Sequence, residues 1–109
     1  MDEAKYQLEY YQQENGSVPF REWLHGLRDQ MAVARIRARL TRVKAGNFGT
    51  IRAVGDGVTE LKVDHGPGYR LYYAMVGKTV VLLLIGGDKS TQDRDIKTAK
   101  SYWREYQGA

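Results

Sequence analysis

The chain has 109 residues, with 17 lysines and arginines against 13 aspartates and glutamates, and a formal net charge of +4. This length is typical of one domain, here 1–109, that buries its own hydrophobic core. The sequence contains no cysteine, which excludes disulfides, thiolate zinc sites and cysteine nucleophiles. The basic balance favours an anionic partner, either nucleic acid or an acidic protein.

The first quarter of the chain predicts one strand and one helix. Residues 1–11 carry acidic side chains and no apolar run, so no signal peptide is expected. Tyr6, Leu8 and Tyr10 alternate with polar residues, which is the pattern of a strand. Pro19 suits the first turn of a helix. The apolar stripe of that helix consists of Phe20, Trp23, Leu24 and Leu27.

The next segment predicts a second helix, from Gln30 to Lys44. Its buried face is expected to contain Val33, Ile36, Leu40 and Val43. Its exposed face is expected to carry Arg35, Arg39 and Arg42. Gly46 suits the end of this helix. The glycine-rich segment 47–57 is expected to be irregular.

The C-terminal half predicts three strands joined by short turns, and then a helix. The strands are expected at 58–64, 69–76 and 80–85, with turns at Gly66-Pro67-Gly68 and Gly77-Lys78. The last strand is apolar on both faces, so it should be central in the sheet, and it is too short to span a membrane. Ser90 or Thr91 is expected to cap the last helix, whose apolar stripe contains Ile96, Ala99, Trp103 and Tyr106.

The predicted element order is therefore β-α-α-β-β-β-α. It indicates one α+β domain with a mostly antiparallel four-stranded sheet packed by helices. With neither a leader nor a membrane span in the sequence, we expect a cytoplasmic protein without a membrane partner.

Three cations, Lys62, Arg70 and Lys89, are expected to gather at this sheet. Strand alternation places Tyr72 on the same face as Arg70. Arginine can bind two phosphate oxygens at once, and a lysine beside other cations can transfer protons. RNA supplies its own nucleophile, the 2′-hydroxyl, so such a cluster can cleave a phosphodiester without metal or cofactor. No helix carries metal ligands at i, i+4 spacing.

These residues can also have purely structural roles, which stay open beside the catalytic interpretation. Lys62 can be a solvent-facing strand lysine, and Arg70 can form an ion pair with Glu60. Tyr69 and Tyr73 alternate with Leu71 and are typical of a core. The candidate catalytic residues are Lys62, Arg70, Lys89 and Tyr72. The candidate RNA-binding residues are Arg52, His65, Tyr69 and Gln92.

The same residues resemble a known family. The segments Glu60-Leu61-Lys62, Gly66 to Tyr73, Leu82-Leu83-Leu84 and Gly86 to Gln92, with Pro19 to Leu24 upstream, are similar to the phage-derived, HigB-like addiction module killer branch of the RelE/ParE toxin superfamily. The sequence departs from the best-known members at two positions. Glu60 stands where they carry a basic residue, and Asp95 where they carry a tyrosine.

The resemblance implies a RelE-like fold and the toxin of a type II toxin–antitoxin system. Such toxins are endoribonucleases that cut mRNA, commonly on the ribosome, and inhibit translation. The implied partners are mRNA, the ribosome and a cognate helix-turn-helix antitoxin, with operator DNA reached only through the antitoxin. By position, the family's catalytic cations correspond to Lys62, Arg70 and Lys89.

Two other functions remain open from the sequence. One is a ParE-like inhibitor of DNA gyrase without nuclease activity, which would act through Arg35, Arg39 and Arg42. The other is a non-catalytic module that only binds its antitoxin or operator DNA.

Overall fold

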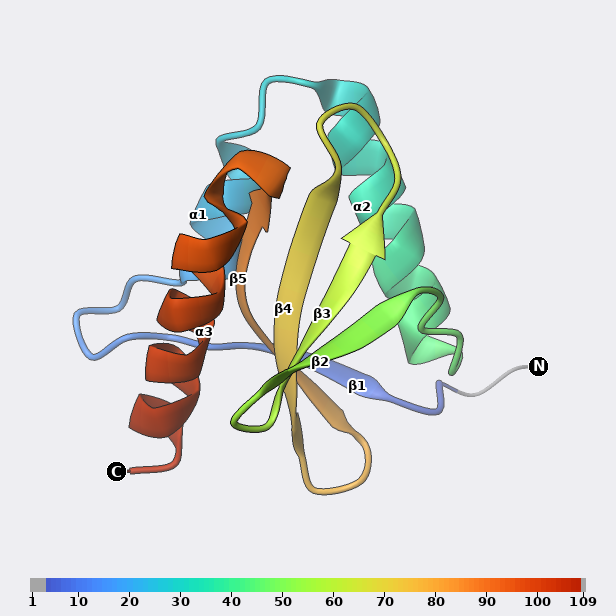
Figure 1. Cartoon of the computed structure of the whole chain (residues 1–109). Coiled ribbons are helices and arrows are strands. Elements are labelled where there is room, and N and C mark those ends of the chain that lie inside the picture. The colour runs from blue at the N-terminus through green and yellow to red at the C-terminus, as the bar shows by residue number, and fades with distance from the viewer. Residues whose placement is uncertain (1–3, 109) are drawn as a thin grey trace.

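A five-stranded mixed sheet with helices on both faces organises the computed structural model, which describes residues 4–108 (Figure 1). The strands and helices follow one another along the chain as β1 (Gln7–Tyr10), α1 (Pro19–His25), α2 (Gln30–Lys44), β2 (Ile51–Gly55), β3 (Val58–Val63), β4 (Tyr69–Val76), β5 (Val80–Asp88), a 3-10 turn (Lys89–Thr91) and α3 (Gln92–Tyr106). No helix in residues 4–108 has both the length and the apolar character needed to cross a membrane.

The sheet differs from the predicted four-stranded one. Its order is β1-β5-β4-β3-β2; β1 runs parallel to β5, and the other pairs are antiparallel. The expected antiparallel arrangement of the last three strands is confirmed. β5 is flanked by β1 and β4, as its apolar character on both faces predicted.

The additional strand is β2, which lies in the segment 47–57 that was expected to be irregular. Its residues are mostly exposed, so no apolar alternation marks it in the sequence. Asp56 and Gly57 take positive φ angles of 56° and 84° in the tight turn that folds β2 back onto β3. The glycines of this segment therefore make a hairpin turn as well as interrupting regular structure.

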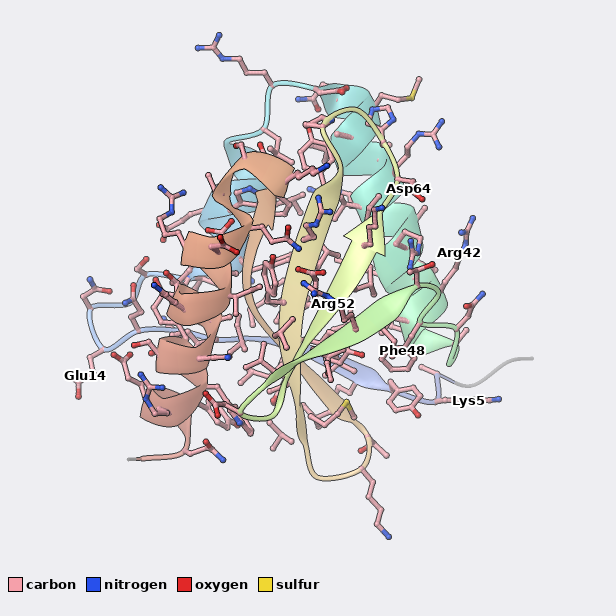
Figure 2. The ribbon with its side chains drawn as sticks, viewed as in Figure 1. Lys5, Glu14, Arg42, Phe48, Arg52 and Asp64 are labelled. Carbon is pink, nitrogen blue, oxygen red and sulfur yellow. The ribbon has the colours of Figure 1, made fainter. Side chains whose placement is uncertain are left out.

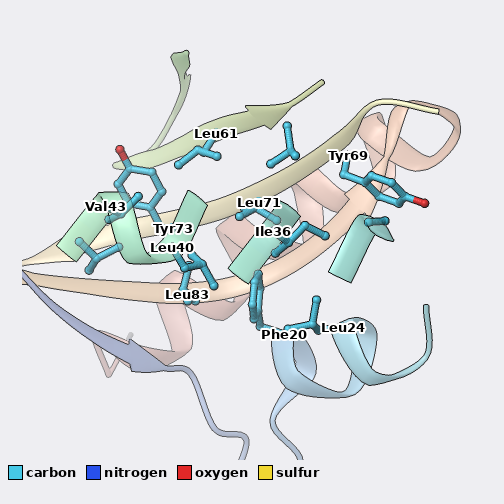
Figure 3. Close-up of a cluster of buried hydrophobic side chains, with 13 residues drawn as sticks. Phe20, Leu24, Ile36, Leu40, Val43, Leu61, Tyr69, Leu71, Tyr73 and Leu83 are labelled. Carbon is cyan, nitrogen blue, oxygen red and sulfur yellow. The ribbon is translucent and has the colours of Figure 1, made fainter. Parts of the chain in front are cut away.

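One face of the sheet is covered by α1 and α2 (Figure 3). The helices contribute Phe20 and Leu24 from α1 and Ile36, Leu40 and Val43 from α2, and the sheet contributes Leu61, Leu71, Tyr73 and Leu83. Val33, predicted to be buried, is only partly so. Arg39, predicted to be exposed, is half-buried and donates hydrogen bonds to two backbone carbonyls.

The opposite face is covered only in part. α3 packs over β5 and β4 through the cluster that contains Tyr72, Ala74, Leu82, Leu84 and Ala99. α3 reaches only the C-terminal end of β2, where Val54 packs with this cluster and Lys100 lies over Gly55. The first residues of β2, Ile51 to Ala53, are exposed (Figure 1). The result is an open area of sheet beside the N-terminal end of α3.

The start of α3 also differs from the prediction. The prediction that Ser90 or Thr91 caps α3 is confirmed in position only, by Thr91, and the side chain of Asp88 accepts the backbone N–H of Ser90 at 2.8 Å. Thr91 occupies the N-cap position without a side-chain capping bond, and its hydroxyl donates to Asp95 at 2.5 Å. Tyr106, expected in the apolar stripe, is 44% exposed.

Gly86 and Gly87 let helices approach β5 from its two faces. A Cβ added at Gly86 would lie 2.2 Å from the ring of Trp23, which comes from α1. A Cβ added at Gly87 would lie 1.8 Å from Oδ2 of Asp95, which comes from α3. Both distances are far below van der Waals contact, so these positions have no room for a side chain.

Alkaline pH is expected to weaken the contact between Tyr11 and α3. The Tyr11 hydroxyl donates to Glu105, and burial, together with this carboxylate, raises the pKa of Tyr11 from 10.0 to about 12. A raised pKa in the folded protein means that the contribution is complete below pH 10 and is lost as pH rises toward 12. Urea unfolding across this range should therefore show a shallower loss of stability in Tyr11→Phe than in the wild type. Equal slopes would contradict the assignment.

Candidate functional site

Two rows of residues cross the open face of the sheet. In one row Arg52 of β2, Glu60 of β3 and Tyr72 of β4 stand opposite one another. In the neighbouring row Lys62 of β3 pairs with Arg70 of β4, and Gly87 of β5 lies beyond Arg70. The antiparallel register therefore brings together Arg52, Glu60, Lys62, Arg70 and Tyr72 from three strands.

Arg70 is the most confined cation of this site. Its residue is 8% exposed, and Nη1 donates to the carbonyl oxygen of Gly68 at 2.7 Å. Gly66 and Gly68 take positive φ angles of 53° and 81°, so the predicted glycine–proline turn is confirmed and directs this carbonyl at Arg70. The Nε of Arg70 is buried and has no hydrogen-bond partner among the described residues. A buried guanidinium N–H without an acceptor is costly unless an acceptor binds there.

Glu60 is the central residue of the other row, between Arg52 and Tyr72. Its carboxylate is buried, at 5% exposure, and accepts hydrogen bonds from the Tyr72 hydroxyl and from Gln92 Nε2, each at 2.9 Å. Arg52 pairs with the second carboxylate oxygen at 3.3 Å, and Figure 2 shows this arginine on the open face. Glu60 therefore joins β2, β4 and α3. Arg70 faces Lys62 across the strands. Among the described residues, Glu60 forms its ion pair with Arg52 and not with Arg70, which was the structural alternative left open by the sequence.

Tyr72 has a different place from the one predicted. Its side chain is fully buried, at 0% exposure. Burial and then the hydrogen bond to Glu60 raise the pKa of its phenol. Strand alternation correctly placed Tyr72 on the Arg70 face, but α3 covers the ring. A covered phenol bound to Glu60 is suited to holding that carboxylate in position.

The two lysines are less enclosed than Arg70. Lys62 is half-buried, and its Nζ lies 3.4 Å from Oδ1 of Asp64. Lys89 is exposed and opens the 3-10 turn that follows β5. Arg70 is paired with Gly87, so Lys89 follows at the same end of the sheet.

Two predicted RNA-binding residues lie away from this open face. Tyr69 is 6% exposed and belongs to the core beneath α1 and α2. The ring of His65 stacks on Tyr69, and its Nε2 lies 3.0 Å from Oδ2 of Asp29 at the start of α2. Tyr69 therefore lies in the core, as its alternation with Leu71 indicated. Neither Tyr69 nor His65, the two candidate RNA-binding residues, lies on the face that carries Arg70.

Asp95 is a buried acid at the same end of the sheet. It is 5% exposed and packs against the backbone of Gly87. Gly87 is the residue of β5 that pairs with Arg70 of β4. The sequence analysis singled out Asp95 only as a departure from the family pattern. Asp95 contacts Gly87 because α3 packs closely on β5 at this point. The spacing of residues along the chain does not indicate how closely the two elements pack.

This geometry is suited to binding a phosphate oxygen at Arg70, beside the second positive charge of Lys62. In residues 4–108 no group of three histidine, aspartate or glutamate side chains is placed to hold a metal ion.

Comparison with known proteins places the chain in a family. The model of the family described as "Phage derived protein Gp49-like (DUF891)" matches residues 22–104. The chain belongs to the Gp49-like family. An uncharacterized protein of Haemophilus influenzae (strain ATCC 51907 / DSM 11121 / KW20 / Rd) is 50% identical to it over 84 residues, which cover 77% of this chain and 85% of that protein.

The Gp49-like family is phage-derived and toxin-like, and is found in toxin–antitoxin systems. This agrees with the phage-derived part of the resemblance. The matched range contains Arg52, Glu60, Lys62, Arg70 and Lys89, so the whole open face lies within the Gp49-like region.

Removing the Tyr72 hydroxyl from this Gp49-like protein is expected to lower its stability. A hydrogen bond to a charged group contributes about 1.5–3 kcal/mol, and Tyr72→Phe removes the one to Glu60. We expect a loss of that size in the free energy of unfolding, measured by urea titration. An unchanged free energy of unfolding would show that this hydrogen bond does not stabilise the fold.

Proposed function

We propose that this Gp49-like protein is the toxin of a type II toxin–antitoxin system and a metal-independent mRNA endonuclease of the RelE/ParE superfamily, HigB-like branch. The observation that carries the proposal is the buried guanidinium of Arg70, whose Nε has no acceptor among the described residues. Lys62 stands directly opposite on β3. An arginine with a free donor beside a second cation is suited to a phosphodiester.

In the proposed reaction the 2′-oxygen of the RNA attacks the adjacent phosphorus and loses its proton. The bond to the 5′-oxygen breaks, and that oxygen gains a proton. The products are a 2′,3′-cyclic phosphate and a 5′-hydroxyl end. Arg70 binds the phosphate oxygens on which negative charge accumulates, while Lys62 and Lys89 are the groups through which protons are exchanged.

The remaining parts of the proposal concern partners and setting. The substrate is mRNA, presented by the ribosome in the cytoplasm. A cognate helix-turn-helix antitoxin neutralises the toxin, and operator DNA is reached only through that antitoxin. An inhibitor that covers Arg52, Lys62 and Arg70 should present acidic side chains to them.

Sequencing of mRNA ends after induction tests the nuclease proposal. New 5′-hydroxyl ends inside coding regions, appearing with the loss of translation, are the expected result. The rival function, inhibition of DNA gyrase, is supported by Arg35 and Arg42, which are exposed on α2. A supercoiling assay with purified protein separates the two: gyrase blocked while mRNA stays intact would overturn the nuclease proposal. Expression without growth arrest, in cells that lack the antitoxin, would instead favour a module that only binds.

A further inference from the structure

A second basic site lies between α2 and β3. It is a hollow of about 230 Å³. Its lining includes four cations and one carboxylate, namely Arg35, Arg39, Arg42, Lys62 and Asp64. The cations come from two different elements, so this is more than the solvated face of one helix. Figure 2 shows Arg42 of α2 and Asp64, next to the end of β3, on the same side of the molecule.

Arg39 fixes the floor of this hollow. Its Nη1 donates to the carbonyl oxygen of Lys62 and its Nη2 to that of Phe48, each at 2.8 Å. Gly49 makes room for the guanidinium, since a Cβ there would lie 2.2 Å from Nη2. Burial, followed by the nearby charge of Arg42, lowers the pKa of Arg39. The bond to the Lys62 carbonyl connects the hollow to the strand that carries one of the proposed catalytic cations.

Arg35 and Arg42 are the cations left available for a ligand. They lie four residues before and three residues after Arg39, so all three share one side of α2. Both are exposed, and neither forms an ion pair with any described residue. Asp64 forms an ion pair with Lys62, at 3.4 Å, and its own side chain is 86% exposed.

We propose that this hollow binds the sugar–phosphate backbone of single-stranded RNA next to the cleaved bond, with Lys62 shared between the hollow and the Arg70 site. The inference rests on the proposed nuclease function and specifies where the substrate strand runs. Guanidinium groups without acidic partners favour phosphate. A protein partner generally needs an apolar centre to its interface, whereas Val63, the large apolar residue of the hollow, is buried at 3% exposure.

The test measures direct binding of RNA that cannot be cleaved. Two fluorescent oligonucleotides with 2′-O-methyl groups at every position are used. One spans only the nucleotides at the scissile bond, and the other extends it by several nucleotides on both sides. The variant Arg35→Gln/Arg42→Gln removes two charges from the hollow. The matched control Arg28→Gln/Arg37→Gln removes two charges from exposed residues that do not line it.

We expect the extended RNA to bind wild type more tightly than the short one. The hollow variant should lose that advantage, and its slope of log affinity against log salt should fall by about 1.4, or 0.7 for each lost phosphate contact. Its affinity for the short RNA, and both affinities of the control variant, should stay at wild-type values. Circular dichroism checks that each variant is folded.

Several results would overturn the inference. The first is equal losses in the hollow and control variants, because these would indicate only nonspecific attraction by net charge. The second is a hollow variant that binds the extended RNA as tightly as wild type does, whether or not this variant loses gyrase inhibition or antitoxin binding.

Failure of the nuclease function would look different. A protein that binds the extended RNA through the hollow but cuts no mRNA would disprove the nuclease function and leave the inferred binding site valid.

Discussion

Replacing Arg70 with alanine is expected to lower the rate of RNA cleavage by about 10²–10³-fold, the usual cost of removing one donor that stabilises transition-state charge. Arg70 is enclosed by the sheet and the glycine–proline turn. A neighbouring side chain therefore cannot readily take its place. The measurement is cleavage of a defined mRNA by purified variant and wild type at equal concentration. Cells expressing Arg70→Ala should accordingly grow while cells expressing wild type arrest.

Two controls separate chemistry from folding. Arg70→Lys retains a positive charge but loses the bidentate geometry of guanidinium, so its rate should fall between those of wild type and Arg70→Ala. Arg28→Gln removes an exposed arginine and should cut RNA at the wild-type rate. If folded Arg70→Ala, verified by circular dichroism, remains fully toxic, the proposed site is wrong.

Adding one methyl group at Gly87 is expected to destabilise the protein by about 1–3 kcal/mol, which is the usual cost of overpacking. The new Cβ would lie 1.8 Å from Oδ2 of Asp95 and 3.0 Å from Oγ1 of Thr91. α3 must therefore move away from β5 at its first turn. Gln92, the first residue of α3, hydrogen-bonds to Glu60, so Gly87→Ala should also slow cleavage. Urea unfolding and the cleavage assay measure the two effects.

Gly86→Ala is the matched control on the other face of β5. Its added Cβ would meet the ring of Trp23, so it should lose comparable stability without moving α3. A double-mutant cycle with Asp95→Ala gives a second check. Gly87→Ala should cost less stability when Asp95 is already shortened, and strictly additive costs would show that this carboxylate is not the obstacle.

Periodicity predicted the parts of the fold that bury apolar side chains. The stripes of α1 and α2 and the two-sided apolar character of β5 indicated the layers correctly, because burial imposes a repeat of 3.6 or 2 residues. β2 carries no such repeat. It exists because a turn with two positive φ angles pairs it with β3. At the other edge of the sheet, β1 does carry the alternation of Tyr6, Leu8 and Tyr10 that predicted it, and it runs parallel to β5.

The sequence predicted which residues of the candidate site share a strand face. It did not predict which residues stand opposite one another on neighbouring strands. Alternation placed Arg70 and Tyr72 together, and the structure agrees. The partner of Arg70 depends on register, which the glycine–proline turn sets: it places Lys62 opposite Arg70 and Glu60 opposite Tyr72. Alternation also assigns Tyr69 to the face opposite Arg70, and its burial there removes it from the open face.

Under the proposed function, the ion pairs of the site bear on which nucleic acids the open face can bind. Arg52 and Lys62 already have the carboxylates of Glu60 and Asp64 as partners, whereas Arg70 has, among residues 4–108, only the Gly68 carbonyl. A polyanion that approaches this face must displace acids from two cations and gains one unshared guanidinium, held at a fixed angle inside the sheet. Under the proposed function, the open face therefore favours a strand that can bring a phosphate to Arg70 over duplex and structured polymers that cannot.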